Sequence, residues 1–341
     1  MKRLSIFNKI VFFFNSLFAT ALLFAYLLPY IPPSVFPFLS VLALGMPVLL
    51  LVNFIFLVYW LIKFKRQFLL STFVLLLGLN HIFSLYKFSE AQEVTDKAEI
   101  KLMSYNVRQF NKYKWLEGDI AGEIIDFVKK EKVDIFCSQE YNMHDLVVFD
   151  EFKNHYIKES VQSKSIGQAI YTNYPIINKG SLDFQSGNNC IYADIKVKED
   201  TLRIFNVHFE SLKIIPEVKS LQKENKKKLI NRVGASFRKQ EEQVSLLKEK
   251  LIQTPYKSII CGDFNNSAFS YIYNELVDLG YKDAFKIAGN GTGKTFDFDF
   301  IPLRIDFFLV DKAIQVNEFN NYDVQLSDHY PISTTIHLPE D

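Results

Sequence analysis

KSIICGDFNNS, from Lys257 to Ser267, is the stretch of this 341-residue chain that decides its fold. The run 258–261 is mostly apolar, which is typical of a short buried β-strand. Gly262 follows the run, and Asp263 and Asn265 then stand two positions apart. A carboxylate and an amide at the end of a buried strand predict a site at the edge of a sheet, where loops open onto a ligand.

Other predicted strands end in polar side chains of the same kind. They are Asn106 after KLMSY, Glu140 after DIFCSQ, His208 after RIFNV, Asp306 within LRIDFFLV, and Asp328 and His329 in SDHYPI. Any one of them alone is more typical of a strand cap or a surface residue. Together, they are the carboxylates, amides and imidazoles that a Mg²⁺-assisted attack on a phosphoester requires. The set therefore predicts metal-dependent phosphoester chemistry.

The pattern between these motifs is that of an α/β protein. From Glu99 onward, short apolar strands alternate with a few helices. Apolar residues at positions 120, 124, 127 and 128 have helical spacing, and further helices are expected over 238–252 and 269–279. Many strands with few helices favour packed sheets with the helices outside. About 240 residues are enough for one such core.

The ordered motifs SYNVR, SQE, NVHFES, GDFNN, RIDFFLV and SDHYP resemble the endonuclease/exonuclease/phosphatase superfamily. Its members include deoxyribonuclease I, the abasic-site exonucleases, the neutral sphingomyelinases and the inositol-polyphosphate 5-phosphatases. The resemblance covers residues 99–338 and is closest to the deoxyribonuclease-I-like and sphingomyelinase-like branches. It implies a four-layer α/β sandwich, in which two mainly antiparallel sheets pack face to face between outer helices.

The resemblance implies metal-binding and substrate-binding roles for four of these positions. Glu140 is similar to the principal Mg²⁺ ligand, with Asn106 beside it, and Mn²⁺ is a possible substitute. Asp328 would serve the metal or its water shell. Some family nucleases have an acid where this chain has Arg108. That difference favours a single metal ion, and it adds a cation that can hold a substrate phosphate.

The resemblance also implies the acid–base residues. Asp263 matches the aspartate that orients or deprotonates the attacking water, or that protonates the leaving oxygen. Asn265 would bind the phosphate or hold Asp263 in place. His208 and His329 would stabilise charge on the phosphoryl oxygens, and His208 would thereby also contact the substrate. Asp306 would pair with His329 and favour its imidazolium form.

The charge distribution divides the chain into two parts. Residues 1–89 hold seven basic side chains and no acidic one, although the whole chain has a net charge of +1. The other residues hold 32 basic and 38 acidic side chains, a net charge of −6. An acidic domain disfavours strong non-specific binding to duplex DNA, which usually depends on a basic surface.

Three apolar runs in the first part, 10–28, 35–62 and 68–86, predict transmembrane helices. A helix rises ~1.5 Å per residue, so about 20 apolar residues cross ~30 Å of hydrocarbon. A secretory signal peptide would explain only the first run, and no small-residue cleavage site follows it. We therefore expect a membrane domain over 1–86, a linker over 87–98 and a catalytic domain over 99–341.

Six of the seven basic residues in the first part lie at the same side of the predicted transmembrane helices. Three basic residues precede the first run, and KFKR separates the second run from the third, whereas the connection PYIPPS is uncharged. Positive charges favour the cytoplasmic side. We expect an integral protein of the cytoplasmic (inner) membrane, with a cytoplasmic N-terminus and an extracytoplasmic, or periplasmic, catalytic domain.

Residues 213–239 form a basic insertion, with nine basic and two acidic side chains. The insertion is interpreted as a solvated helical segment, as a patch that faces anionic lipid headgroups, or as part of a phosphate-rich substrate cleft.

Three functions follow from these patterns. The first is a membrane-tethered Mg²⁺-dependent phosphodiesterase or nuclease that acts outside the cytoplasmic membrane. The second keeps this chemistry but acts on a phospholipid or another lipid-linked phosphoester. The third is a catalytically inactive, membrane-anchored binding module. The expected partners are the membrane and a phosphoester substrate, either nucleic acid or a lipid headgroup, and no obligate protein partner is indicated.

Three cysteines, Cys137, Cys190 and Cys261, lie in apolar strand-like runs. An extracytoplasmic location permits disulfides. Their number is odd and their surroundings are apolar, so we expect buried thiols that pack as small hydrophobic residues.

Overall fold

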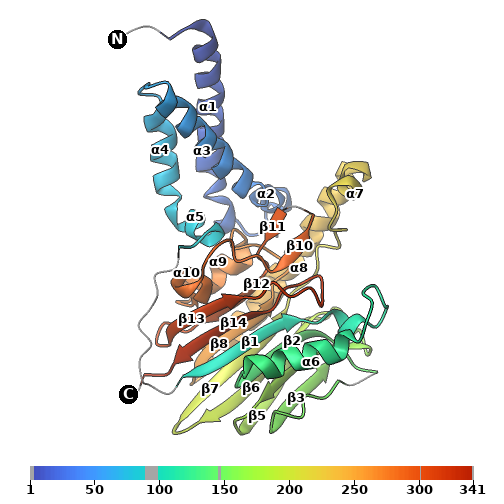
Figure 1. Cartoon of the computed structure of the whole chain (residues 1–341). Helices are drawn as coiled ribbons and strands as arrows, with labels where there is room; N and C mark the ends of the chain where they lie inside the picture. Colours follow the sequence, from blue (N-terminus) through green and yellow to red (C-terminus); the bar gives the residue numbers. More distant parts are fainter. Residues whose placement is uncertain (1–3, 89–98, 145–146, 300, 340–341) are drawn as a thin grey trace.

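The computed structural model describes residues 4–88, 99–144, 147–299 and 301–339. Residues from 99 onward form two six-stranded sheets (Figure 1). The first sheet contains, in spatial order, β13 (Gln315–Asn321), β14 (Ile332–His337), β1 (Ile100–Asn106), β2 (Ile135–Asn142), β4 (Ile166–Thr172) and β3 (Asn154–Glu159). Only its β1–β2 pair is parallel among the pairings described.

The second sheet repeats this design. It contains, in spatial order, β5 (Ile176–Asp183), β6 (Asn189–Val197), β7 (Asp200–His208), β8 (Lys257–Asp263), β12 (Asp306–Val310) and β9 (Lys282–Asp283). Here β7 and β8 are the parallel pair. A separate hairpin is formed by β10 (Phe296–Phe298) and β11 (Ile301–Leu303). The predicted combination of two mainly antiparallel sheets is confirmed.

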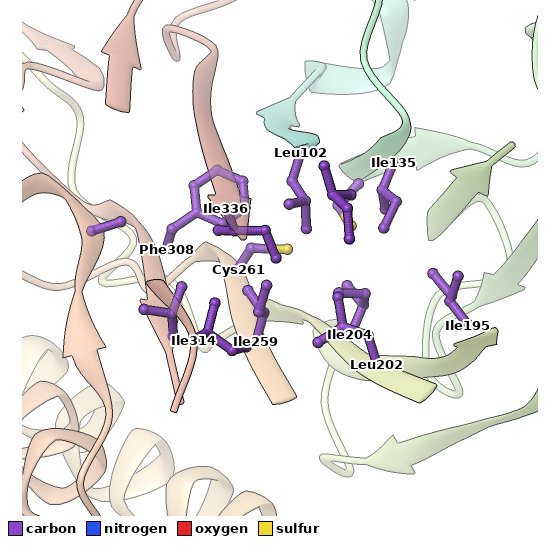
Figure 2. Close-up of a cluster of buried hydrophobic side chains, with 14 of the residues drawn as sticks. Leu102, Ile135, Ile195, Leu202, Ile204, Ile259, Cys261, Phe308, Ile314 and Ile336 are labelled. Atoms are coloured by element: carbon purple, nitrogen blue, oxygen red, sulfur yellow. The ribbon is translucent and has the colours of Figure 1, made fainter. Parts of the chain in front are cut away.

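The largest core lies between the two sheets. Leu102 and Ile135 of the first sheet face Ile204 and Ile259 of the second, and all four are fully buried (Figure 2). Each buried side chain of this size stabilises the fold by roughly 1.5–3 kcal/mol. The inward-facing positions of both sheets are therefore apolar over most of their length.

Helices cover the outer face of each sheet, which completes the predicted α/β sandwich. Helix α6 (Ile120–Glu131) packs on the first sheet, and α8 (Lys226–Ile252) and α9 (Tyr271–Asp278) pack on the second. The shorter elements are η2 (Arg108–Asn111), α7 (Val218–Lys223) and α10 (Ala284–Ala288). The helix predicted over 238–252 is longer than expected, because it begins inside the basic insertion.

The buried strand that ends at the site depends on one glycine. Gly262 has φ +127°, and a Cβ atom there would overlap the carbonyl oxygen of Val207. The backbones of β7 and β8 approach each other closely at this point, so only glycine fits. The three cysteines are free and buried, as expected, and Cys261 lies in this same strand.

The N-terminal region consists of helices α1 (Ile6–Ala25), η1 (Leu28–Tyr30), α2 (Pro37–Ala43), α3 (Met46–Ile62), α4 (Phe68–Leu77) and α5 (Leu79–Leu85). Within the described residues, one helical stretch, Ile6–Tyr30, is long and apolar enough to cross a membrane. The predicted span 35–62 is two helices bent by 48°, and 68–86 is two helices bent by 73°. Three spans result only if each bent pair counts as one.

The bends have local causes that the apolar pattern does not reveal. Gly45 precedes α3, and Pro47 in its first turn lacks the N–H that would continue a helix from α2. Gly78 separates α4 from α5, where the ring of Tyr26 leaves no space for a side chain. The predicted domain boundaries stay predictions. Most of the predicted linker, residues 89–98, lies outside the described residues.

The N-terminal helices form a bundle that contacts the sandwich at one end (Figure 1). Ser34 donates from its backbone nitrogen and its hydroxyl to the Glu241 carboxylate of α8, at 2.6 and 2.8 Å. Arg304 donates to the carbonyl of Ser84 at 3.2 Å. The start of α1 and the turn between α3 and α4 lie at the opposite end of the bundle (Figure 1).

Candidate active site

Sheet register places three of the predicted residues in one row. The parallel pairing of β7 and β8 sets His208 opposite Asp263, and the antiparallel pairing of β8 and β12 sets Asp263 opposite Asp306. Residues that are directly opposite on neighbouring strands lie on the same face of a sheet. All three side chains are buried. The second sheet therefore brings together residues that are up to 98 positions apart in sequence.

The first sheet contributes Asn106 and Glu140 from its parallel strands. Glu140 has φ +51° and lies where the pairing of β2 with β4 becomes irregular. Such irregularities redirect a side chain, and backbone strain of this kind is common at functional sites. The Asn106 Nδ2 donates to Asp263 Oδ2 at 3.1 Å and to Glu140 Oε1 at 3.4 Å. One amide thus joins carboxylates from both sheets.

His329 completes this cluster from the segment that precedes β14. Its Nδ1 lies 2.9 Å from Asp306 Oδ2, and its Nε2 lies 3.7 Å from Asp263 Oδ2. The ring of Phe296 contacts it edge to face, with 4.8 Å between ring centroids. The predicted pairing of His329 with Asp306 is therefore present in the structure.

The two histidines have opposite electrostatic states. Burial by itself lowers the pKa of His329, but the carboxylates of Asp306 and Asp263 outweigh it and raise this pKa to about 10. Burial, helped by the nearby His329, lowers the pKa of His208 to about 3. At neutral pH the site therefore contains one imidazolium and one neutral imidazole.

Asp263 has the environment of a group that exchanges protons near neutral pH. Burial raises its pKa to about 7, although His329 opposes the shift. Asn265, with φ +48°, donates its backbone nitrogen to Asp263 Oδ1 at 2.7 Å and its Nδ2 to Oδ2 at 3.2 Å. The same Nδ2 donates to the carbonyl of Phe209 at 3.0 Å. Asn265 thus fixes the orientation of the carboxylate.

Arg108 and Asp328 lie beside this cluster as an ion pair. The Arg108 Nη1 is 2.9 Å from Asp328 Oδ2, and the guanidinium lies over the ring of Trp115. Four consecutive residues, Arg108 to Asn111, have φ between +43° and +60°. Left-handed backbone costs roughly 1–2 kcal/mol per residue other than glycine. This strained turn is a local feature that the sequence pattern did not indicate.

Sequence reasoning also missed a polar cluster under the site. Gln139 Nε2 donates to Asn206 Oδ1 at 2.7 Å and to Ser104 Oγ at 3.1 Å, and Gln168 Nε2 donates to the carbonyl of Asn206 at 3.0 Å. The four side chains are buried and come from both sheets. A glutamine next to Glu140 and an asparagine two positions before His208, each inside an apolar strand, were the available signal.

Glu140 fits the requirements of a divalent metal ligand. Its carboxylate makes no ion pair within the described parts of the chain, and its hydrogen bond to Asn106 is long. Burial raises the pKa of Glu140, although the positive charges of His329 and Arg108 oppose the shift. A Mg²⁺ ion prefers carboxylate oxygens and retains several waters, so one half-buried carboxylate with a nearby amide is a suitable donor set.

A second group of potential ligands is formed by Asp263, Asp306 and His329, whose donor atoms lie within 4.8 Å of one another. Metal-bound histidine must be deprotonated. Because the two carboxylates raise the pKa of His329 to about 10, its imidazolium already compensates their charge. This cluster is better suited to proton transfer than to holding an ion.

Two family models match the chain. Residues 103–329, more than half of the chain, match the Endonuclease/Exonuclease/phosphatase family. The chain belongs to this family. Its members are metal-dependent phosphoester hydrolases, and the chain is an enzyme of this class. Residues 8–85 match a model described as Domain of unknown function (DUF8431). No curated protein matches the chain.

Solved structures with the same fold cover the sandwich but not the N-terminal helices. An endonuclease/exonuclease/phosphatase family protein from Bacteroides thetaiotaomicron is 19% identical, with a TM-score of 0.54, and the match covers 71% of this chain and 98% of that one. A mannosyl-6-phosphatase from the same organism is 20% identical, with a TM-score of 0.53 and coverages of 70% and 99%. The human nocturnin catalytic domain with bound sulfate is 15% identical, with a TM-score of 0.53 and coverages of 72% and 96%. Identities at this level establish the shared fold alone.

Proposed function

We propose that this family member is a membrane-tethered, Mg²⁺-dependent phosphodiesterase with an endonuclease-like or exonuclease-like site. The observation that carries the proposal is the Asn106 amide, which lies between the Glu140 and Asp263 carboxylates of the two sheets. A metal ligand and a proton acceptor are thereby held beside each other at one sheet edge. A phosphoester hydrolase needs this juxtaposition, because the phosphate is polarised at one side while water is activated at the other.

Glu140 would hold the Mg²⁺ ion, for which Mn²⁺ can substitute, with Asn106 beside it. The bound ion would polarise a phosphoryl oxygen and neutralise developing charge. Asp328 would hydrogen-bond the water shell of the ion. Its ion pair with Arg108 leaves the guanidinium beside the metal site, where it would bind a substrate phosphate.

Asp263 would accept the proton of the attacking water. A carboxylate with a pKa of about 7 is well matched to proton transfer at neutral pH. Asn106 and Asn265 would hold its two oxygens in place through the hydrogen bonds described above. Nothing in this step requires Asp263 to move, because three hydrogen bonds already hold the carboxylate.

The two histidines would act on the phosphoryl group in different ways. His329, charged and held by Asp306, would stabilise the oxygens of the transition state. One well-aimed donor of this kind is worth ~3–4 kcal/mol. His208, neutral and buried, would donate a hydrogen bond to a phosphoryl oxygen without adding charge.

Hydrolysis of bis-p-nitrophenyl phosphate by the purified full-length protein tests this proposal. With Mg²⁺ or Mn²⁺ present, we expect turnover that falls ~10²-fold or more in Asp263→Asn and in His329→Ala. Lys153→Ala, which changes an exposed lysine next to the edge strand β3, serves as the control. Equal turnover by the wild type and both site variants would favour the inactive binding module.

The membrane tether is supported by the apolar helix Ile6–Tyr30 and by the position of the bundle at one end of the sandwich (Figure 1). Lys63, Lys65 and Arg66 lie at the end of the bundle remote from the sandwich, which favours a cytoplasmic location for that end. The catalytic domain would then face the extracytoplasmic side. A reporter fused after Asp341 tests this sidedness, since reporter activity confined to the cytoplasm would exclude it.

A lipid-linked phosphoester is the second candidate substrate. The observation that favours it is the direct contact of the bundle with α8 and with Arg304, which holds the sandwich against the membrane region. Incubation of the full-length protein with plasmid DNA and with phospholipid vesicles separates the two substrates. Release of headgroup with intact DNA would replace the nuclease proposal by a phospholipid hydrolase.

A further inference from the structure

We propose that five exposed lysines at the start of the basic insertion bind the anionic headgroups of the membrane that holds α1. We call them the lysine lip: Lys219, Lys223, Lys226, Lys227 and Lys228. The inference rests on the membrane tether of the proposed function, and it adds a lipid-binding site that is separate from the hydrolytic site.

The lysine lip has no acidic partners among the described residues, whereas three of the other four cations of the insertion do. Lys213 and Lys239 each lie 3.3 Å from Glu210, and Arg232 pairs with Glu224. The five lysines of the lip are exposed, and none makes an ion pair with a residue in the described ranges. A concentration of unpaired cations is electrostatically complementary to an anionic surface.

Helix α8 places the lip close to the membrane helices. Gly234 of α8 packs closely against Pro37 of α2. A side-chain Cβ atom at position 234 would lie 3.1 Å from the Cβ atom of the proline. The segment 226–228 lies six to eight residues earlier on the same helix, which is roughly 9–12 Å of helix. Because Glu241 also binds Ser34, two points along α8 fix its direction relative to α2.

The surface of α2 and of the two residues before it indicates what surrounds this contact. Val35, Phe36, Phe38 and Leu42 have exposed fractions of 58, 55, 53 and 46%. A row of large apolar side chains that is not covered by protein belongs in the hydrocarbon or at its boundary. Helix α7 lies level with α2 along the axis of α1 (Figure 1). The lip therefore lies at the depth where headgroups are expected.

The three lip lysines on α8, Lys226 to Lys228, lie too far from the hydrolytic site to bind the reacting phosphate. Gln240 of α8 contacts the site loop, since its Nε2 is 3.3 Å from the carbonyl of Asn265. The segment 226–228 is 12 to 14 residues earlier on α8, which is roughly 18–21 Å along the helix and beyond the reach of a lysine side chain. This separation favours lipid headgroups over a phosphate-rich substrate cleft as the partner of these three lysines.

The full-length protein in lipid nanodiscs provides the test. Gln222→Cys, within α7, accepts a fluorophore selectively, because the three native cysteines are buried. The discs contain phosphatidylcholine, increasing fractions of phosphatidylglycerol and a trace of lipid with a quencher at its headgroup. We expect quenching to rise with phosphatidylglycerol and to fall when salt screens the charges.

Two matched triple variants give the lip its specific test. K226Q/K227Q/K228Q removes three lysines from the lip, and K129Q/K130Q/K132Q removes three exposed lysines from the end of α6. A lysine near an anionic surface strengthens binding roughly fivefold, so the first variant should lower the binding constant of the lip for phosphatidylglycerol headgroups about 100-fold. The control variant should respond as the parent does.

Three results would contradict the proposed lipid binding by the lip. They are quenching that does not depend on the phosphatidylglycerol fraction, an equal loss of quenching in both triple variants, and a dye response to a soluble oligonucleotide but not to phosphatidylglycerol. Failure of the protein to insert into the discs would remove the tether and the lip together. Hydrolysis of bis-p-nitrophenyl phosphate on the same discs is read separately. A protein that responds to phosphatidylglycerol but hydrolyses nothing would lose the proposed chemistry and keep the lip.

Discussion

The helical bundle and the sandwich both bury polar side chains, but they do so with opposite consequences. In the bundle, Asn15 accepts a hydrogen bond from Trp60 at 2.9 Å and donates one to Ser71 at 2.8 Å. These neutral groups satisfy one another. In the sandwich, Asp263 and His329 are ionisable, buried and shifted in pKa. Burial of satisfied amides and hydroxyls holds helices together, whereas burial of unlike ionisable groups prepares them for chemistry.

The largest expected effect follows from Glu140, which has no counterpart in the bundle. Glu140→Gln should lower hydrolysis ~10²–10³-fold, because the metal loses its charged ligand. It should also weaken Mn²⁺ binding at least ~10-fold, whereas His329→Ala should leave that affinity within about threefold. Calorimetric titration of the metal-free protein with Mn²⁺ measures both affinities. If His329→Ala loses the metal and Glu140→Gln keeps it, the Asp263–Asp306–His329 cluster is the ligand set instead.

In the metal-free protein, His208 and Asp263 should change the free energy of unfolding in opposite directions as the pH falls. The pKa of His208 is about 3 when folded against 6.5 ordinarily, so its stabilising contribution is lost as pH falls below 6.5. The pKa of Asp263 is about 7 against 3.8 ordinarily, so its contribution is present at low pH and lost as pH rises through 7. Between pH 6.5 and 4 the two contributions oppose each other.

Replacing each residue in turn should reveal these two opposing contributions to the free energy of unfolding. Relative to the wild type, the free energy of unfolding of His208→Gln should rise on acidification from pH 6.5 to 4.5, by up to ~1.4 kcal/mol per pH unit. That of Asp263→Asn should fall by a similar amount over the same range. Denaturant titrations of both variants in a chelator provide the values. Parallel pH profiles for all three proteins would mean that these two groups do not have the shifted pKa values.

The smallest effect is expected in the bundle. Asn15→Ala removes the partner of Trp60 and Ser71, so it should lower the free energy of unfolding in detergent by ~0.6–1.7 kcal/mol. The turnover number should stay within about twofold of the wild type, since this amide contacts no residue of the sandwich in the described structure. A loss of turnover larger than the loss of folded protein would show that the bundle shapes the site directly.

Much of the sandwich was predictable because its central strands are short apolar runs with strongly polar ends. The strands that carry Asn106, His208 and Asp263 were all expected, as was a helix around positions 120–128, which the structure has as α6. The edge strands β3 and β5 were missed, because sequences such as NHYIKE and IINKGSLD expose polar residues and resemble loops. Their pairing with a central strand, rather than their own composition, makes them strands.

The candidate site was predictable as a set of residue types, but its connections were not. The pairing of His329 with Asp306 followed from the family resemblance. The links from Asn106 to two carboxylates, and the ion pair of Asp328 with Arg108, depend on how two sheets face each other. Local sequence contains no information of that kind. The breaks at Gly45 and Gly78 were likewise hidden by the apolar composition around them.

The position of a bound Mn²⁺ ion tests the account most directly. Anomalous diffraction from crystals of the full-length protein grown with Mn²⁺ locates the ion without reference to any assumed ligand. We predict one ion bound to a Glu140 carboxylate oxygen, with Asp263 and His329 outside its first coordination shell. An ion bound between Asp263, Asp306 and His329, or bound nowhere near Glu140, would contradict the account.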